Sequence, residues 1–292
     1  MWDLLACPFD HQPLQGDADW LTCSDCGRGY PVLDGLPTFL PGEESPAWLA
    51  AQTDRVAALP DDWPAMPPDR SRAIRQRART LEHLLRRHID LDYGTRLLQV
   101  GLPRDAELLH FRGGERYGVE PLAGELNARG LLRWGQVRWV SGRGEELPFA
   151  DGSFQAVLLG DVLASVESPA AVLEEAARCL APEGLLWISC PVLPGSSRRT
   201  GRQADSRGGS TRLRDFTTST LIRFSRRAGL KLRWSAWTDG LHAEEPAPPR
   251  REWLDPRTWW NCRQPRSRSF LFQPRRALSR AAWQPAIAAA SV

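Results

Sequence analysis

The middle of the chain alternates short apolar runs with one amphipathic stretch. Val137–Val140 and Phe154–Leu159 each have the length of a strand, and the second is mostly apolar, as expected of a strand buried on both faces of a parallel sheet. Between residues 169 and 180, apolar side chains recur at helical spacing. Leu185–Ser189 is a further apolar run. This order of strand, strand, helix and strand predicts an α/β fold.

The flanking segments extend the pattern on both sides. Arg96–Val100 and Tyr117–Val119 are predicted as two earlier strands, and residues 70–87 as a basic amphipathic helix before them. Downstream, Thr217 is predicted to cap a helix that continues to Ala228. Leu230–Trp237 then alternates as another strand.

The turn between the two central strands carries a family resemblance. Leu147-Pro148-Phe149, then Ser153-Phe154, then a helix that closes in residues 180–184 follow one another in order and spacing. This segment resembles the C-terminal half of a class I S-adenosylmethionine (SAM) dependent methyltransferase core. The resemblance implies a Rossmann-like α/β sheet, SAM as the cofactor and an unknown methyl acceptor.

The resemblance also implies a cofactor site at the ends of the strands. Glu120, which ends the second strand, would accept hydrogen bonds from the ribose hydroxyls, since a carboxylate beside the switch point of a sheet suits a diol. Gly101 would lie at the turn beside the methionine moiety, and Gly144 and Glu145 along the adenine. Asp161, after the fourth strand, is the candidate base or substrate contact; the alternative is that it caps a helix or turn.

Several residues depart from the family pattern at this site. Gln99 stands where the family has an acid, and Arg143 where it commonly has an acid near the adenine amine. In the first loop, Pro103 donates no backbone hydrogen bond, and Asp105 adds bulk. Two readings follow: a SAM-dependent methyltransferase with a degenerate cofactor loop, or a catalytically inactive methyltransferase-like scaffold or partner protein.

The N-terminal segment has the spacing of a zinc ribbon. Cys7 begins one turn, and Cys23 and Cys26 form a second about fifteen residues later. The first turn lacks its second cysteine; Asp10 occupies that position and His11 follows it. Either side chain can complete a zinc site with the three thiolates. The alternative is a ribbon without metal, held together by apolar side chains: Leu4, Leu14, Leu21, Tyr30, Val32 and Leu36.

The same segment carries a second resemblance. Cys7-Pro8, Pro13-Leu14 and the run Tyr30–Pro37 resemble the small Trm112-like domain. In that family the domain packs beside SAM-dependent methyltransferases or activates them, which implies a protein partner or a fused methyltransferase domain. The predicted organisation is a ribbon over residues 1–41, a linker over 42–69, a methyltransferase-like core over 70–240 and a basic aromatic segment over 241–292.

Composition adds few constraints. The net charge of +3 does not by itself imply a polyanionic partner. No apolar run reaches membrane-spanning length and no secretion signal is visible, so a cytoplasmic protein without a membrane partner is expected. Three of the six cysteines fall in the ribbon, and the scattered Cys179, Cys190 and Cys262 suit a reducing compartment.

Two arginine-rich segments raise a third possibility. Residues 190–215 predict a long irregular loop, and the segment from residue 250 interleaves arginines with aromatics, including Trp253, Trp259, Trp260 and Trp283. Arginine beside aromatic rings is the chemistry of single-stranded RNA binding. The alternative, which we favour, is that Ser269–Phe272 is the last strand of the sheet with its aromatics buried.

Overall fold

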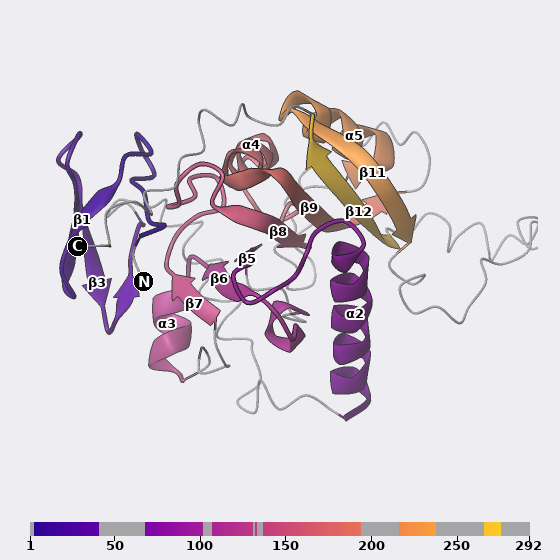
Figure 1. Cartoon of the computed structure of the whole chain (residues 1–292), viewed down its shortest axis with the longest axis horizontal. Coiled ribbons are helices and arrows are strands. Elements are labelled where there is room, and N and C mark those ends of the chain that lie inside the picture. Colours follow the sequence, from indigo (N-terminus) through magenta and orange to yellow (C-terminus); the bar gives the residue numbers. More distant parts are fainter. Residues whose placement is uncertain are drawn as a thin grey trace, which may run out of the picture.

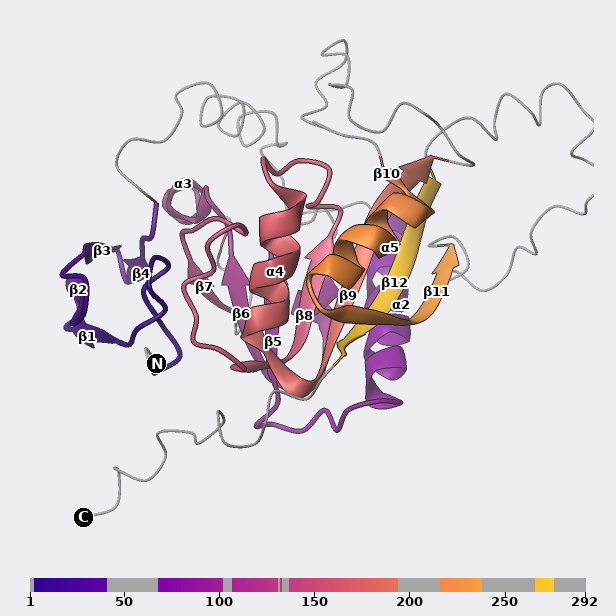
Figure 2. The same ribbon diagram turned by 90° about the horizontal axis from the view of Figure 1, so that it is seen from above.

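The computed structural model describes residues 3–40, 68–101, 107–130, 132, 137–193, 216–237 and 266–275. Within these ranges the chain forms a small antiparallel sheet near its N-terminus and a larger mixed sheet with helices on both faces (Figures 1 and 2). The predicted α/β class with a small N-terminal sheet is confirmed.

The larger sheet has eight strands among the described residues, in the order β11-β12-β9-β8-β5-β6-β7, with β10 paired to β9 outside this path. The strands are β5 (Arg96–Val100), β6 (Glu115–Val119), β7 (Val137–Val140), β8 (Phe154–Gly160), β9 (Leu180–Leu193), β10 (Phe216–Thr217), β11 (Leu230–Trp237) and β12 (Arg266–Pro274). Strands β5 to β9 are parallel, whereas β12 pairs antiparallel with β9 and β11. After β7 the chain returns to the other side of β5, which makes β5/β8 the switch point of the sheet.

One predicted boundary is wrong. The helical pattern was expected to continue through Leu180, with residues 182–184 stopping the helix before a strand at Leu185, but β9 already begins at Leu180. The reason is local: the helix ends at Cys179, and Leu180 takes an extended conformation with φ −74° and ψ 134°. Leu180 then pairs with Phe154 and Leu185 with Ala156, and the register shift between these two pairs accommodates Pro182 and Gly184 within the strand.

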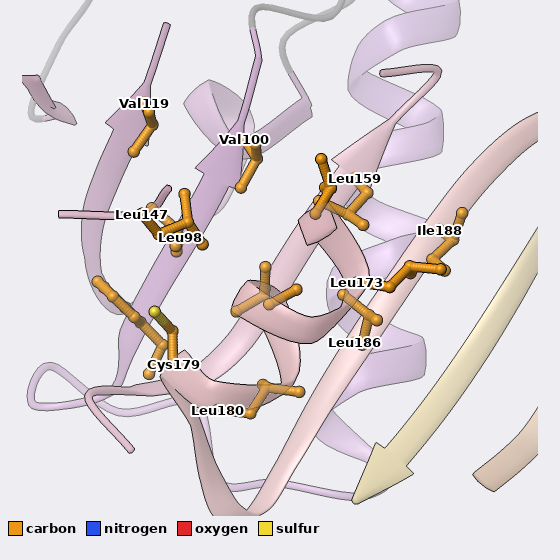
Figure 3. Packing of buried hydrophobic residues seen from close by; sticks show 14 of the residues in the cluster. Leu98, Val100, Val119, Leu147, Leu159, Leu173, Cys179, Leu180, Leu186 and Ile188 are labelled. Atoms are coloured by element: carbon orange, nitrogen blue, oxygen red, sulfur yellow. The ribbon is translucent and has the colours of Figure 1, made fainter. Parts of the chain in front are cut away.

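Helices cover both faces of the sheet. They are α2 (Pro68–Arg86), the short 3-10 helix η1 (Glu107–His110), α3 (Ala123–Ala128), α4 (Pro169–Cys179) and α5 (Thr218–Arg227). Alternate side chains of β5 belong to two buried clusters: Leu98 and Val100 share one with side chains of α4 and α5, and Leu97 shares the other with side chains of α2. Helices α4 and α5 lie on one face of the sheet and α2 on the other (Figure 2), and Leu98 and Val100 lie on the same side as Leu173 of α4 (Figure 3). This alternation follows from the two-residue period of a strand.

The cap of α5 offers a local test of the fold. The buried Thr217 accepts a hydrogen bond on its Oγ1 from the Thr220 amide at 3.2 Å, as the sequence predicted. Thr217→Ala removes this acceptor, so we expect the free energy of unfolding to fall by about 1 kcal/mol in urea denaturation. Thr217→Ser keeps the hydroxyl and serves as the control. Equal losses in both variants would contradict a capping role.

The N-terminal sheet contains β1 (Leu14–Gly16), β2 (Trp20–Cys23), β3 (Gly29–Leu33) and β4 (Leu36–Pro37), paired in that order. It lies beside β7, at the edge of the larger sheet (Figures 1 and 2). Leu21, Val32 and Phe39 belong to the same buried cluster as Phe149 and Tyr117. The two sheets therefore share one hydrophobic core.

Candidate functional site: the carboxyl edge of the sheet and a cysteine cluster

Three of the predicted site residues follow the ends of parallel strands. Gly101 comes after β5, Glu120 after β6 and Asp161 after β8. The Gly101 amide donates to the Val119 carbonyl at 2.7 Å, and the Glu120 amide donates to the Val140 carbonyl at 3.2 Å. Because the carboxyl ends of parallel strands meet at one edge, these residues share that edge, with Gly101 and Asp161 on the two sides of the switch point.

Both predicted glycines stand where a side chain would collide. Gly101 has φ 75°, and a Cβ there would lie 3.0 Å from Cγ2 of Val162 in the loop after β8. A Cβ on Gly144 would lie 2.8 Å from Cγ1 of Val100, at the end of β5. The glycines therefore allow the loops after β7 and β8 to lie directly against the end of β5.

Glu120 is half-buried and held in place by its surroundings. Its Oε1 accepts a hydrogen bond from the Leu122 amide at 3.2 Å, and its carbonyl accepts one from the Ala123 amide at 3.1 Å. These bonds fix both the backbone and the carboxylate at the end of β6. An oriented carboxylate at this edge is suited to bind a pair of hydroxyl groups.

Glu145 and Arg143 have a role that the sequence did not reveal. Oε1 of Glu145 accepts hydrogen bonds from the amides of Glu167 and Ser168, at 2.9 and 3.3 Å. Arg143 pairs with Glu145 (Nε to Oε2, 3.7 Å) and with Glu167 (Nη2 to Oε2, 2.7 Å). Together they tie the loop after β7 to the start of α4. Arg143 is thus engaged in ion pairs instead of presenting an isolated charge.

Asp161 is exposed and has an unusual backbone. Its φ of 55° lies in the left-handed region, which few non-glycine residues adopt and which Asp adopts more readily than most. Its amide donates to the Ser189 carbonyl at 2.9 Å, and its Oδ1 accepts a hydrogen bond from Ser189 Oγ at 3.2 Å. Ser189 was not predicted as a site residue; its only signal was a hydroxyl at the end of an apolar run.

The other departures from the family pattern are only partly described. Gln99 lies within β5 and is 3% exposed, so its amide is buried beside the switch point. Pro103 and Asp105 lie outside the described residues, as do residues 194–215 and the four tryptophans of the C-terminal segment. The predicted strand at Ser269–Phe272 lies within β12, and its aromatics Phe270 and Phe272 are fully buried.

The turn at residues 147–151 is fixed by one arginine. Arg178 Nη1 donates to the Phe149 carbonyl at 2.7 Å and to Asp151 Oδ1 at 2.8 Å, and Nη2 donates to the Leu147 carbonyl at 2.9 Å. Nε and Nη2 also donate to the two carboxylate oxygens of Glu175, at 2.8 and 2.6 Å. Burial opposes the charge of Arg178, but its hydrogen bonds with Glu175 outweigh this effect and raise its pKa.

The small sheet brings together four of the five predicted metal ligands. One ligand atom each from Cys7, Asp10, Cys23 and Cys26 lies within 4.8 Å of all the others, and the two sulfurs of Cys7 and Cys26 are 3.6 Å apart. Ligand atoms about 2.3 Å from one tetrahedral ion are separated by about 3.7 Å, so the geometry fits such an ion. His11 lies outside the cluster: its backbone is left-handed, with φ 61°, and its Nε2 is 3.8 Å from Glu175 Oε1.

The protonation of the cluster depends on its surroundings. Partial burial raises the pKa of Asp10, but hydrogen bonds from the Gln12 amide and from the thiols outweigh it and lower the pKa to about 2. Burial raises the pKa of Cys7 to about 11, although the hydroxyl of Tyr30, 3.1 Å from the sulfur, acts in the opposite direction. An ionised carboxylate and thiols that a bound cation would deprotonate form a suitable donor set for a metal.

Comparison with known proteins agrees with the two units. Residues 98–188 match a family described as a methyltransferase domain, and residues 1–35 match the Trm112p-like protein family. An uncharacterised methyltransferase of Mycobacterium sp. (strain KMS) is 33% identical over 173 residues, which make up 55% of this chain and 65% of that protein. A UPF0434 protein of Chelativorans sp. (strain BNC1) is 46% identical over 46 residues, or 15% of this chain and 65% of that protein.

The chain thus spans 65% of the length of both relatives. Among solved structures, the 1,6-didemethyltoxoflavin-N1-methyltransferase of Burkholderia thailandensis, crystallised with 1,6-didemethyltoxoflavin and S-adenosylhomocysteine, is 18% identical. The match covers 86% of this chain and 97% of that chain, with a TM-score of 0.51, and concerns the fold. Among the described residues, none of the helices combines the length and apolar character needed to span a bilayer.

Proposed function

We propose that the protein is a SAM-dependent methyltransferase, because residues 98–188 match the methyltransferase domain family and residues 1–35 match the Trm112p-like family. The observation that carries the proposal is the carboxylate of Glu120, oriented by the Leu122 amide at the carboxyl edge beside the switch point. Ligands of doubly wound sheets bind in the crevice at this position.

The chain's own residues would act mainly by positioning. SAM, when bound, supplies a methyl group activated by a sulfonium, so the protein must hold an acceptor nucleophile in line with it. Glu120 would bind the ribose hydroxyls, Gly101 would form the turn beside the methionine moiety, and Gly144 would let the loop after β7 pack on β5 along the adenine. Asp161, hydrogen-bonded to Ser189, would contact the acceptor or take up its proton.

A non-catalytic scaffold is the competing function. It is favoured by Gln99, a neutral amide buried in β5 where the methyltransferase pattern has an acid. The two functions differ in whether the edge of the sheet still binds the cofactor. Arg143 does not favour the scaffold, since it is paired with Glu145 and Glu167.

Calorimetric titration of the full-length chain with S-adenosylhomocysteine distinguishes the enzyme from the non-catalytic scaffold. The enzyme proposal predicts saturable binding with a Kd in roughly the micromolar range, or about −8 kcal/mol. Absence of binding to a sample that unfolds cooperatively would contradict it and favour the scaffold. A chain that binds the product then warrants a search for acceptors with radiolabelled SAM.

For the cysteine cluster we propose zinc. Thiolates are preferred ligands of zinc in closed tetrahedral sites, and a carboxylate oxygen can serve as the fourth ligand. Cys7, Cys23 and Cys26 with Asp10 make up this set. Metal analysis of protein purified from zinc-supplemented medium tests the assignment, with nickel affinity tags avoided.

A further inference from the structure

The ribbon contacts both ends of the loop that approaches the cofactor edge. At one end the Ala6 amide donates to the Pro148 carbonyl at 3.1 Å, and the Ala150 amide donates to the Leu4 carbonyl at 2.9 Å. These bonds form a short antiparallel pairing around Leu5 and Phe149. The residues just before the cluster are therefore hydrogen-bonded to the end of the loop.

The other end of the loop also pairs with the ribbon, here in the parallel direction between Thr38 and Ser141. The Phe39 amide donates to the Ser141 carbonyl at 2.7 Å, and the Ser141 amide donates to the Pro37 carbonyl at 2.9 Å. Residues 141–150 thus begin and end on the ribbon. Gly144, which packs against the end of β5, lies between the two attachments.

A third contact joins the ribbon to α4. His11 Nε2 is 3.8 Å from Oε1 of Glu175, and Oε2 of Glu175 accepts a hydrogen bond from the Leu147 amide at 2.9 Å. Glu175 therefore contacts a residue next to the candidate ligand Asp10 on one side and the loop on the other.

The candidate ligands lie in the two turns of the ribbon that support this arrangement. Cys7 directly follows Ala6. Its carbonyl accepts a hydrogen bond from the His11 amide at 2.8 Å, and its amide donates to the Gln12 carbonyl at 2.9 Å, so these two bonds close the first turn. The second turn begins at Cys23, at the end of β2. An ion bound to both turns would join the N-terminal segment to β2 through ligand bonds, in addition to the shared apolar core.

We propose that Cys7, Asp10, Cys23 and Cys26 form a three-thiolate, one-carboxylate zinc centre whose occupancy positions residues 141–150 for cofactor binding. Asp10 binds the ion, and His11 contacts the methyltransferase-like domain. The effect on cofactor affinity rests on the function proposed above; the effect on the loop does not. Coupling between two sites is reciprocal, so the cofactor product must raise zinc affinity by the same factor as zinc raises product affinity.

The test compares the zinc-loaded full-length chain with the same chain dialysed against a chelator. Hydrogen exchange at the Ala150 and Ser141 amides reports the two attachments directly, and the β8 amides serve as the internal control. We expect zinc removal to accelerate exchange at both sites, leave β8 protected and weaken S-adenosylhomocysteine binding on the order of tenfold. Re-adding zinc must restore both properties.

Matched variants identify the carboxylate ligand. Asp10→Ala is expected to lower zinc affinity and raise loop exchange at a limiting zinc concentration, whereas Asp25→Ala, which removes an exposed acid from the second turn, should change neither. Asp10→Cys supplies a fourth thiolate and should restore loop protection. This rescue distinguishes lost metal binding from a general folding defect.

The outcomes separate the two proposals. A chain that binds no zinc, or whose loop exchanges equally with and without stoichiometric zinc, overturns this inference even when S-adenosylhomocysteine binds. Zinc-dependent protection of the loop in a chain that binds no S-adenosylhomocysteine upholds the positioning role and overturns the methyltransferase function. Equal zinc affinity of Asp10→Ala and the unmodified chain overturns the assignment of the fourth ligand.

Discussion

Glu120→Ala is expected to weaken S-adenosylhomocysteine binding on the order of 100-fold while the unliganded chain keeps nearly the same Tm. Hydrogen bonds to a charged group contribute about 1.5–3 kcal/mol each, and loss of two ribose contacts removes about 3 kcal/mol. The side chain makes a hydrogen bond to the Leu122 amide, but the strand end is also fixed through the Glu120 backbone. Calorimetry with the product measures the loss directly.

The control for Glu120→Ala removes a charge elsewhere. Glu174 is an exposed acid on α4, so Glu174→Ala changes the net charge equally and should leave Kd unchanged within about twofold. Glu120→Gln keeps an acceptor for the Leu122 amide without the charge, so its Kd should lie between those of Glu120→Ala and Glu174→Ala. Equal affinity of Glu120→Ala and the unmodified chain would remove Glu120 from the cofactor site.

Arg178→Ala is expected to lower the free energy of unfolding by about 3 kcal/mol or more. The side chain is 13% exposed, and its removal leaves Glu175, also 13% exposed, without its bidentate partner. It also removes the charged donor from the carbonyls of Leu147 and Phe149, of which the Leu147 carbonyl keeps only the Phe149 amide at 2.9 Å. At about 2–4 °C per kcal/mol, the Tm should fall by roughly 6–12 °C.

Two variants show whether this loss is specific. Arg223→Ala removes an exposed arginine from α5 and should change stability by less than about 0.5 kcal/mol. Arg178→Lys keeps the positive charge but not the planar guanidinium that donates to several acceptors at once, so it should recover only part of the lost stability. Denaturation curves in urea measure the free energy of unfolding of Arg178→Ala, Arg178→Lys and Arg223→Ala. A Tm for Arg178→Ala within 2 °C, on the order of the shift for 1 kcal/mol, would contradict the role.

The sequence alone determined the local elements and the two units of this protein. The period of the apolar positions predicted the parallel strands and α4, and the Thr217 cap with the following helix predicted α5. β11 spans Leu230–Trp237 as expected, because alternation and capping depend on residues close together in the chain. The predicted boundary at residues 182–184 was wrong because pairing with β8 starts the strand at Leu180, before the proline and glycine.

The tertiary structure decided how distant residues combine. It inserted β12 between β9 and β11, brought Asp10 and not His11 to the cysteines, and joined Glu145 to the start of α4. It also placed Arg178 of α4 against the turn at residues 147–151, where it donates hydrogen bonds that no sequence pattern predicted. These contacts depend on backbone direction and on segments far apart in the chain, which periodicity and spacing do not encode. The assignments of SAM and zinc are predictions that combine the sequence motifs with the positions of the residues in the tertiary structure.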